Sequence, residues 1–449
     1  MGGFAPRSSG GREELRHEPS SRALSIGSAP SARKGRVMAV DLTDPRIMLD
    51  PEVLADPRAF YDTLRSDAPV WQIPGQDTFV VSDPKLIREV VGRTDDFSSN
   101  LVNVLHDDGS GRLVPFQIAP YRSSVHVLST ADPPLHDRHR KLLQPHLSPA
   151  AVARFAPAIA AIVDEQLSQM LASSHADAVS TFSDAVPART ICKVIGLSDA
   201  DVPAVLRYAN GTGALLDGVT DLEGMERAAT SGFELTIFVH ERLEATLAQS
   251  PSDRWGMLAV FADEIENGAV TAREVRDMLV VFVTAGSETT ASLLATAIET
   301  LARDQERQEE LRSDPSLIPG AIEEILRSDG PFQFHYRFTP DETTLGGITI
   351  PAKSQVLLMW AAANRPSSDE DVEAEGTSAR IKPPPHFAFG RGLHHCIGAP
   401  LARLEARIAI ERLLGATRSI HLDDASRPTR RPSIFIRRHA SLPVVLEES

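Results

Sequence analysis

The sequence predicts a mainly α-helical protein with small β-sheets, folded as one large domain over residues 38–449. Helical periodicity dominates residues 132–327 and returns after residue 399. Strand-like segments occur in two groups, near residues 70–81 and 334–360. No internal repeat or low-complexity linker follows the N-terminal tail, and 449 residues with 42% hydrophobic content can bury a large core.

The N-terminal tail, residues 1–37, is expected to be a disordered extension. It is rich in Ser, Gly and Arg, carries seven Arg or Lys against three Glu, and lacks the apolar core of a secretory signal. Its Arg and Ser content is similar to that of an organellar transit peptide, but Glu13, Glu14 and Glu18 argue against that interpretation. Met38, just before the first ordered-looking sequence, is a candidate start residue.

Composition predicts a soluble, cytoplasmic protein that binds no nucleic acid and does not span a membrane. The net charge is −15, from 61 acidic and 46 basic residues, which argues against general nucleic-acid binding. The longest apolar run, Met278 to Gly286, is about half of the ~18 residues that a membrane span needs. Two cysteines do not make a disulfide framework, so a reducing compartment is expected. Cys192, in an apolar stretch, should be a small buried hydrophobe.

In chain order, Asp-Pro pairs at residues 56–57 and 83–84 predict the starts of two short helices, because Asp caps a helix and Pro suits its first turn. Between them, residues 70–73 and 78–81 flank a Pro-Gly-Gln-Asp turn and predict a hairpin. Residues 97–130 mix apolar residues with Gly and Pro without a period. We expect a long loop there that covers a binding site.

The central part of the chain is predicted to be helical. Asp132-Pro begins a helix in which His136 and Arg140, four residues apart, lie on one face. Further helical patterns follow at residues 150–172, 186–197, 201–216 and 224–248.

The longest helical pattern opens with the capping box Thr271-Ala-Arg-Glu and runs to about residue 302. Its middle, residues 283–291, contains small residues, a Gly and threonines among good helix formers, a local conflict that often marks a functional site. A Thr hydroxyl can bond to the carbonyl one turn earlier and bend the helix, which opens room for a ligand. By itself this segment leaves open whether Glu288 and Thr289 are functional or belong to an ordinary helix face.

Residues 319–327 predict a helix in which Glu324 and Arg327 can form an ion pair. A small sheet should follow. Its strands are predicted at residues 334–338, 343–345, 348–350 and 356–360, with Gly346-Gly347 as a hairpin turn.

The loop from His386 to Gly398 surrounds Cys396 with three glycines, which allow backbone conformations and close approaches that a side chain would block. From Leu401 onward, apolar residues at helical spacing predict a helix. Cys396 therefore precedes a helix N-terminus, where amide donors and positive potential favour a thiolate. From these residues alone, Cys396 could be a nucleophile, a metal ligand or a redox thiol.

Together these motifs resemble the cytochrome P450 superfamily, in particular its soluble bacterial-type haem-thiolate monooxygenases. The resemblance covers about residues 40–447 and rests on four motifs in the family's order. These are His136-x-x-x-Arg140, similar to a basic pair near a haem propionate; Ala285-Gly-Ser-Glu-Thr-Thr, similar to the oxygen-binding motif; Glu324-x-x-Arg327; and Phe389-Gly-Arg-Gly-Leu-His-His-Cys-Ile-Gly, similar at every fixed position to the haem-binding signature.

The resemblance implies a b-type haem, iron protoporphyrin IX, with Cys396 as the thiolate metal ligand. It also implies that Ala285, Phe389, Gly390 and Gly398 contact the haem and that Glu288 and Thr289 deliver protons. Glu324 and Arg327 would be a structural pair. The implied propionate ligands are basic, as carboxylates require: His136, Arg140, Arg337 and His394.

The implied reaction inserts one oxygen atom of O₂ into a hydrophobic small molecule. Electrons would come from NAD(P)H through a separate ferredoxin or flavodoxin and its reductase, since no reductase domain is expected after the last strand-like segment. Positive charge for docking this partner is expected from Arg138, Lys141, Arg391, Arg403 and Arg407. The alternatives are a peroxide-driven peroxygenase, which needs no proton relay, and a non-catalytic haem sensor or ligand-binding protein.

One segment departs from the family. Residues 367–381 lack the Arg-Phe element whose Arg would join Glu324 and Arg327, which leaves Arg365, Arg380 or no residue as the third partner. The substrate pocket is expected between the 97–130 loop, Ala285–Gly286 and Phe332–His335.

Overall fold

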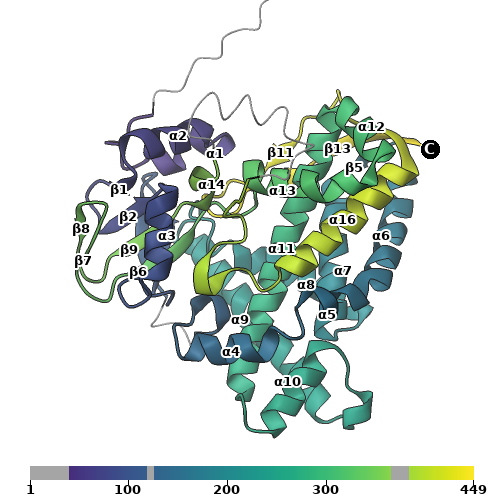
Figure 1. The fold of residues 1–449 in the computed structure, drawn as a ribbon, viewed down its shortest axis with the longest axis horizontal. Coiled ribbons are helices and arrows are strands. Elements are labelled where there is room, and N and C mark those ends of the chain that lie inside the picture. Colours follow the sequence, from purple (N-terminus) through teal and green to yellow (C-terminus); the bar gives the residue numbers. More distant parts are fainter. Residues whose placement is uncertain (1–39, 119–125, 366–383) are drawn as a thin grey trace, which may run out of the picture. The chain divides into compact units, whose positions relative to one another are not determined.

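The computed structural model describes residues 40–118, 126–365 and 384–449. The predicted N-terminal extension, residues 1–37, lies outside this part. The described chain is mainly helical with small sheets, as predicted (Figure 1). Its helices are α1 (Pro51–Ala55), α2 (Arg58–Asp67), α3 (Pro84–Gly92), α4 (Leu135–Leu143), α5 (Pro149–Val152), α6 (Ala156–Leu171), α7 (Ala185–Ile195), α8 (Val202–Gly213), α9 (Leu222–Leu247), α10 (Gly256–Glu266), α11 (Ala272–Arg303), α12 (Gln305–Ser313), α13 (Ile318–Asp329), α14 (Trp360–Ala363) and α16 (Ala399–Ala416).

The strands are short and form one four-stranded sheet and several smaller ones. They are β1 (Val70–Gln72), β2 (Thr78–Val81), β3 (Asn103–Asp107), β4 (Leu113–Gln117), β5 (His175–Asp177), β6 (His335–Phe338), β7 (Thr343–Leu345), β8 (Ile348–Ile350), β9 (Gln355–Leu358), β10 (Thr417–Leu422), β11 (Thr429–Arg430), β12 (His439–Ser441) and β13 (Pro443–Glu448).

Helix α11 is the central element of the helical part. The predicted capping box is present: the Thr271 hydroxyl accepts from the Glu274 amide, and the Thr271 amide donates to Glu274 Oε2 at 2.9 Å. The helix packs against α7, α8, α9, α13 and α16, and Figure 1 shows it running between them. By length and composition α11 could cross a membrane, but 61% of its most apolar window is buried inside the protein, so it is a core helix.

The largest sheet has the strand order β1-β2-β9-β6, in which β2 and β9 are parallel and the other neighbours are antiparallel. Every residue of β2 and β9 is buried, as expected for strands covered on both faces. The apolar cluster on this sheet includes Phe79, Val356, Trp360 and Phe387. Because Phe387 lies at the entrance of the Cys396 loop, the sheet and the loop share one core.

The prediction of a structureless loop over residues 97–130 was wrong for its middle. Strands β3 and β4 form an antiparallel hairpin with Asn103 opposite Gln117. Pro115 and two glycines hid this pattern, but Pro is tolerated in a two-stranded ribbon, and Gly109 and Gly111 take positive φ angles in the turn. Residues 119–125 lie outside the described part.

Other differences concern boundaries and elements that the sequence did not reveal. Helix α4 begins at Leu135 rather than at Asp132, because the Asp132 carboxylate accepts from Ser98 and from the Ser99 amide. The helices α1, α10, α12 and α14 and the strands β5 and β10 to β12 were not predicted, and Trp360, expected at the end of a strand, begins α14.

Candidate active site

The loop around Cys396 is shaped by its backbone. The Cys396 amide donates to the Phe389 carbonyl at 2.9 Å. Gly390 and Gly392 have φ angles of +65° and +76°, which are strained for any residue with a side chain. Gly398 has an ordinary φ angle, but a Cβ there would lie 3.8 Å from the Cys396 sulfur. The first two glycines therefore set the turn of the loop, and the third keeps one side of the sulfur free of side-chain atoms.

Cys396 is exposed, and it directly precedes the first turn of α16, as predicted. Although the residue is accessible on one side, the protein atoms packed around the thiol desolvate it and raise the pKa of Cys396. The Gly398 and Ala399 amides, which donate to the sulfur, and the charges of Arg140 and Arg403 act in the opposite direction. A sulfur that accepts amide hydrogen bonds and still presents an open face suits a thiolate metal ligand.

The structure brings the four predicted propionate ligands together. The rings of His136 and His394 are 4.4 Å apart, and Arg140 Nη1 donates to the His395 carbonyl at 2.8 Å. Burial, followed by the Arg337, His136 and Arg140 charges, lowers the pKa of His394 to about 3.

This basic cluster contains buried donors without an anionic partner among the described residues. Both ring nitrogens of His394 are buried without a hydrogen-bond partner there. Arg337 is buried, donates to the carbonyl of Tyr336, and has its pKa lowered by burial to about 10, with the Asp132 charge opposing. Buried guanidinium groups ordinarily pair with carboxylates. The cluster therefore fits the propionates of the haem that the resemblance implies.

The sequence analysis missed a fifth member of the cluster, His335. Trp360 Nε1 donates to His335 Nδ1 at 2.7 Å, and an indole N–H can only donate. His335 must then be a neutral ring with its proton on Nε2, consistent with burial and the Arg337 charge lowering its pKa to about 3. Only the pairing of β6 with β9 reveals this contact, since it places His335 opposite Leu358, two residues before Trp360.

In the middle of α11, Ala285 is exposed although most of the helix is buried. Thr289 Oγ1 donates to the Ala285 carbonyl at 2.8 Å, which is the predicted bond to the preceding turn. Glu288 is buried and accepts from Arg438 Nη1 at 2.9 Å. Burial raises the pKa of Glu288, and Arg438 opposes that rise. Because successive residues lie about 100° apart on a helix, Thr289 follows the exposed side and Glu288 the buried one.

The predicted structural pair is formed and reaches the Cys396 loop. Arg327 binds Glu324 through two bonds of 2.9 and 2.7 Å, and Arg327 Nη1 donates to the Asn364 carbonyl at 2.9 Å. Asn364 Oδ1 in turn accepts from the Phe387 amide at 2.6 Å. Asn364, which carried no signal in the sequence, therefore connects the pair to the loop.

Neither arginine proposed as the third partner of this pair is seen to join it. Arg365 binds Asp62 instead, with 2.8 Å between Nη2 and Oδ2. Arg380 lies outside the described residues, so its predicted role stays untested.

The basic surface beside Cys396 carries less free charge than predicted. Arg403 binds Glu323 at 2.6 and 2.8 Å and stacks on Phe389. Two further arginines of the predicted set are paired with carboxylates: Arg407 with Glu411 and Arg138 with Glu274. Lys141 and Arg391 are exposed.

Comparisons with known proteins identify the family of this chain. The family model for cytochrome P450 matches residues 217–431. Cytochrome P450 144 of Mycobacterium tuberculosis is 31% identical over 422 residues, covering 94% of this chain and 96% of the relative. The β-dihydromenaquinone-9 ω-hydroxylase of the same organism is 32% identical over 370 residues, 81% of this chain and 71% of the relative.

The solved structures give the same result. The crystal structure of CYP109E1 from Bacillus megaterium in complex with testosterone has a TM-score of 0.77 and 25% identity, covering 88% of this chain and 98% of that one. The sequence relatives and the fold agree, and the chain is a member of the cytochrome P450 monooxygenase family.

Proposed function

We propose that this chain binds a b-type haem through the Cys396 thiolate and inserts one oxygen atom of O₂ into a hydrophobic small molecule. The observation that carries the proposal is an accessible cysteine whose sulfur accepts from two backbone amides, together with the His394 ring nitrogens and the buried Arg337 guanidinium, for which the described residues provide no carboxylate partner. Haem, when bound, supplies an iron centre that activates O₂, and a thiolate ligand favours O–O cleavage.

The residues of this chain would hold and orient that group. The Gly398 and Ala399 amides direct the sulfur and moderate its charge. The cluster residues would donate to the propionates: His136, Arg140, His335, Arg337 and His394. The Glu324–Arg327 pair, through Asn364, keeps the loop in place.

Proton supply is proposed to depend on α11. Thr289 Oγ1 lies on the exposed side of the helix and can hold a proton there while bonded to the Ala285 carbonyl. Glu288, the residue before Thr289, is the nearest acid in sequence. Arg438 binds its carboxylate on a different side of α11 from the Thr289 hydroxyl.

Replacing Cys396 by Ser tests the ligand assignment. The reduced CO complex of the native protein should show the red-shifted Soret band of a thiolate haem, and the variant should lose it. Cys192→Ser is the matched control, because Cys192 is a buried residue of α7 and should leave the band in place. Persistence of the band in the Cys396 variant refutes the assignment.

A hydrophobic substrate is supported by the relatives, two of which are named as hydroxylases of β-dihydromenaquinone-9 and 6-deoxyerythronolide B. Screening hydrophobic compounds for a low-to-high-spin shift of the haem would identify the substrate class without a redox partner. Small polar compounds alone giving the shift would refute the proposed class.

Electrons are proposed to come from NAD(P)H through a ferredoxin or flavodoxin in the cytoplasm. The supporting surface is Lys141 and Arg391, with an apolar groove of about 420 Å³ between α13 and α16, lined in part by Ile322 and Leu404. A bacterial ferredoxin with its reductase is the probe, and an electrostatic contribution predicts that reduction of the haem protein slows as salt is added.

Thr289→Ala separates this function from the two alternatives. A monooxygenase should oxidise NAD(P)H without a matching yield of product when the hydroxyl is lost. A peroxide-driven enzyme should keep its peroxide-supported rate in the variant. A haem sensor should show no turnover in either the native protein or the variant.

A further inference from the structure

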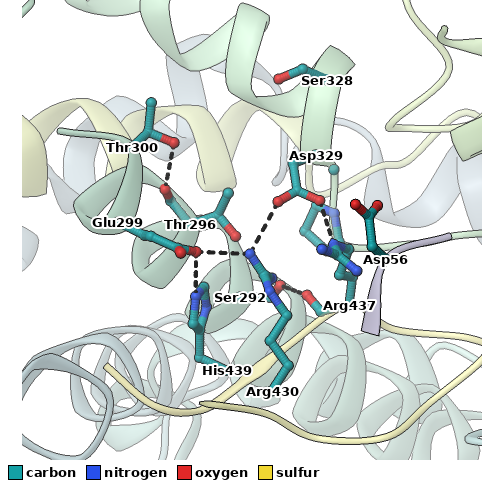
Figure 2. A network of polar contacts seen from close by, with 12 residues as sticks. Asp56, Ser292, Thr296, Glu299, Thr300, Ser328, Asp329, Arg430, Arg437 and His439 are labelled. Atoms are coloured by element: carbon teal, nitrogen blue, oxygen red, sulfur yellow. Dashed lines mark hydrogen bonds and ion pairs between the residues drawn. The ribbon is translucent and has the colours of Figure 1, made fainter. Parts of the chain in front are cut away.

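One face of α11 is bonded at three positions, Glu288, Ser292 and Glu299, to the segment that runs from β11 to β12. Arg438 binds Glu288 at 2.9 Å, and the Ser292 hydroxyl donates to the Arg437 carbonyl. Further along, Glu299 accepts from Arg430 at 2.8 Å and contacts His439 Nε2 at 2.7 Å; Figure 2 shows Ser292, Glu299 and their partners in this arrangement. The segment therefore has a defined register on α11, with Arg438 opposite Glu288.

Arg438 also binds residues in two further parts of the chain. Its Nη1 also donates to Asn210 of α8 at 2.6 Å, and its Nη2 donates to Asp184, just before α7, at 2.7 Å. Arg438 is only 4% exposed. Glu288 and Asp184 thus share one buried cation.

Gly213, the last residue of α8, leaves room for the Glu288 carboxylate because it has no side chain. A Cβ on Gly213 would lie 2.5 Å from Glu288 Oε2, which is too close for a real contact. The carboxylate is therefore held between the Gly213 backbone and the Arg438 guanidinium, and a side chain at residue 213 would displace it.

We propose that Arg438 is a positioning residue for Glu288: its buried ion pair fixes the place of this carboxylate, on a different side of α11 from the Thr289 hydroxyl, and favours the charged form. The inference rests on the proposed function, in which these two residues handle protons. Arg438 touches neither substrate nor haem in this account and acts through Glu288.

The charges around Glu288 set the direction of each effect. Burial raises the pKa of Glu288; Arg438 and Arg431 lower it, and Asp184 raises it. Asp217, after α8, is a second acid near Glu288; it is partly buried, and desolvation raises its pKa to about 6. Removing Arg438 should thus favour the protonated form of Glu288, whereas removing the charge of Asp184 should favour the ionised form.

The experiment is infrared titration of the haem-loaded protein. The carboxylic-acid band of Glu288 is the one lost in Glu288→Gln, and its midpoint is followed with pH. Arg438→Met should move the midpoint to higher pH and Asp184→Asn to lower pH. The pH profile of coupled turnover should move in the same directions. A merely structural role would not produce two shifts of opposite sign.

Arg430→Met is the matched control, because Arg430 is a largely buried arginine of the same segment that binds Glu299 and Asp329 rather than Glu288. It should lower stability and leave the Glu288 midpoint in place. If Arg438→Met does not fold, Arg438→Lys should give a smaller upward shift. An unchanged midpoint in either Arg438 variant, or the same shift in the Arg430 variant, overturns the proposal. Failure of the proposed function would appear separately, as absence of the thiolate CO spectrum.

Discussion

Asn364 offers the sharpest test of how the Cys396 loop is held. Its Oδ1 is the acceptor for the Phe387 amide at 2.6 Å, and its side chain is nearly buried. Asn364→Ala would leave that amide without its partner. An unsatisfied buried N–H costs about 1–3 kcal/mol, and we expect a loss of that size in the free energy of unfolding.

The bond from Arg327 should survive this change, because Arg327 donates to the Asn364 backbone carbonyl. The loss therefore isolates one contact between the sheet core and the loop. Because Phe387 leads into the loop, haem should also dissociate faster, by roughly 10-fold if about 1.4 kcal/mol of the loss falls on the bound state.

Urea unfolding followed by circular dichroism measures the stability, and transfer of haem to apomyoglobin measures the dissociation rate. Asn364→Asp is the matched control, since it keeps an oxygen at the same place and should stay close to the native protein in both assays. An alanine variant within about 0.5 kcal/mol of the native protein, the usual effect of a neutral surface change, would refute the reasoning.

Three further predictions follow from the same contacts. Arg337→Met should speed haem dissociation by about 10- to 100-fold, the range for one lost charged hydrogen bond. The haem-free protein should be as stable as the native one or more stable, because a buried guanidinium without a carboxylate partner is removed. A less stable haem-free protein would contradict this prediction. Trp360→Phe should release His335 from its single tautomer, detected by nitrogen-15 NMR of the diamagnetic CO complex, and an unchanged spectrum would contradict the assignment. Burial alone would raise the pKa of Glu299, but hydrogen bonds from His439 and Arg303 bring it to about 2. Because this folded-state pKa lies below the ordinary value, the contribution to stability is complete above about pH 4.5 and is lost as the pH falls toward 2; Glu299→Gln should flatten acid unfolding in that window.

Local sequence signals predicted the main helices and strands wherever a helix cap, a turn motif or a hydrophobic period was present. The capping box at Thr271, the Asp83-Pro start of α3 and the Gly346-Gly347 turn are all found. The hairpin β3–β4 was missed because its Pro and glycines mask the alternation, and its pairing depends on contacts outside each strand.

Several contacts of the candidate site could be found only in the tertiary structure, because they join residues that are far apart in the sequence. His335 and Trp360 meet through strand pairing, and Asn364 joins Arg327 to Phe387 across more than twenty residues in each direction. None of these residues belongs to a motif with fixed spacing. The ion pairs of Arg403, Arg407 and Arg138 likewise reduced a basic surface that the sequence had predicted from charge alone.

The sequence by itself determined the family and predicted Cys396 as the haem ligand, because the Cys396 loop and the α11 motif are each contiguous in sequence and their spacing carries the information. The tertiary structure decided how the acid and the alcohol of α11 are placed. Glu288 and Thr289 are neighbours in sequence, but helical geometry turns them to different sides, and a buried arginine 150 residues away holds the carboxylate. Burial and charge at that distance are properties of the fold, which no local pattern contains.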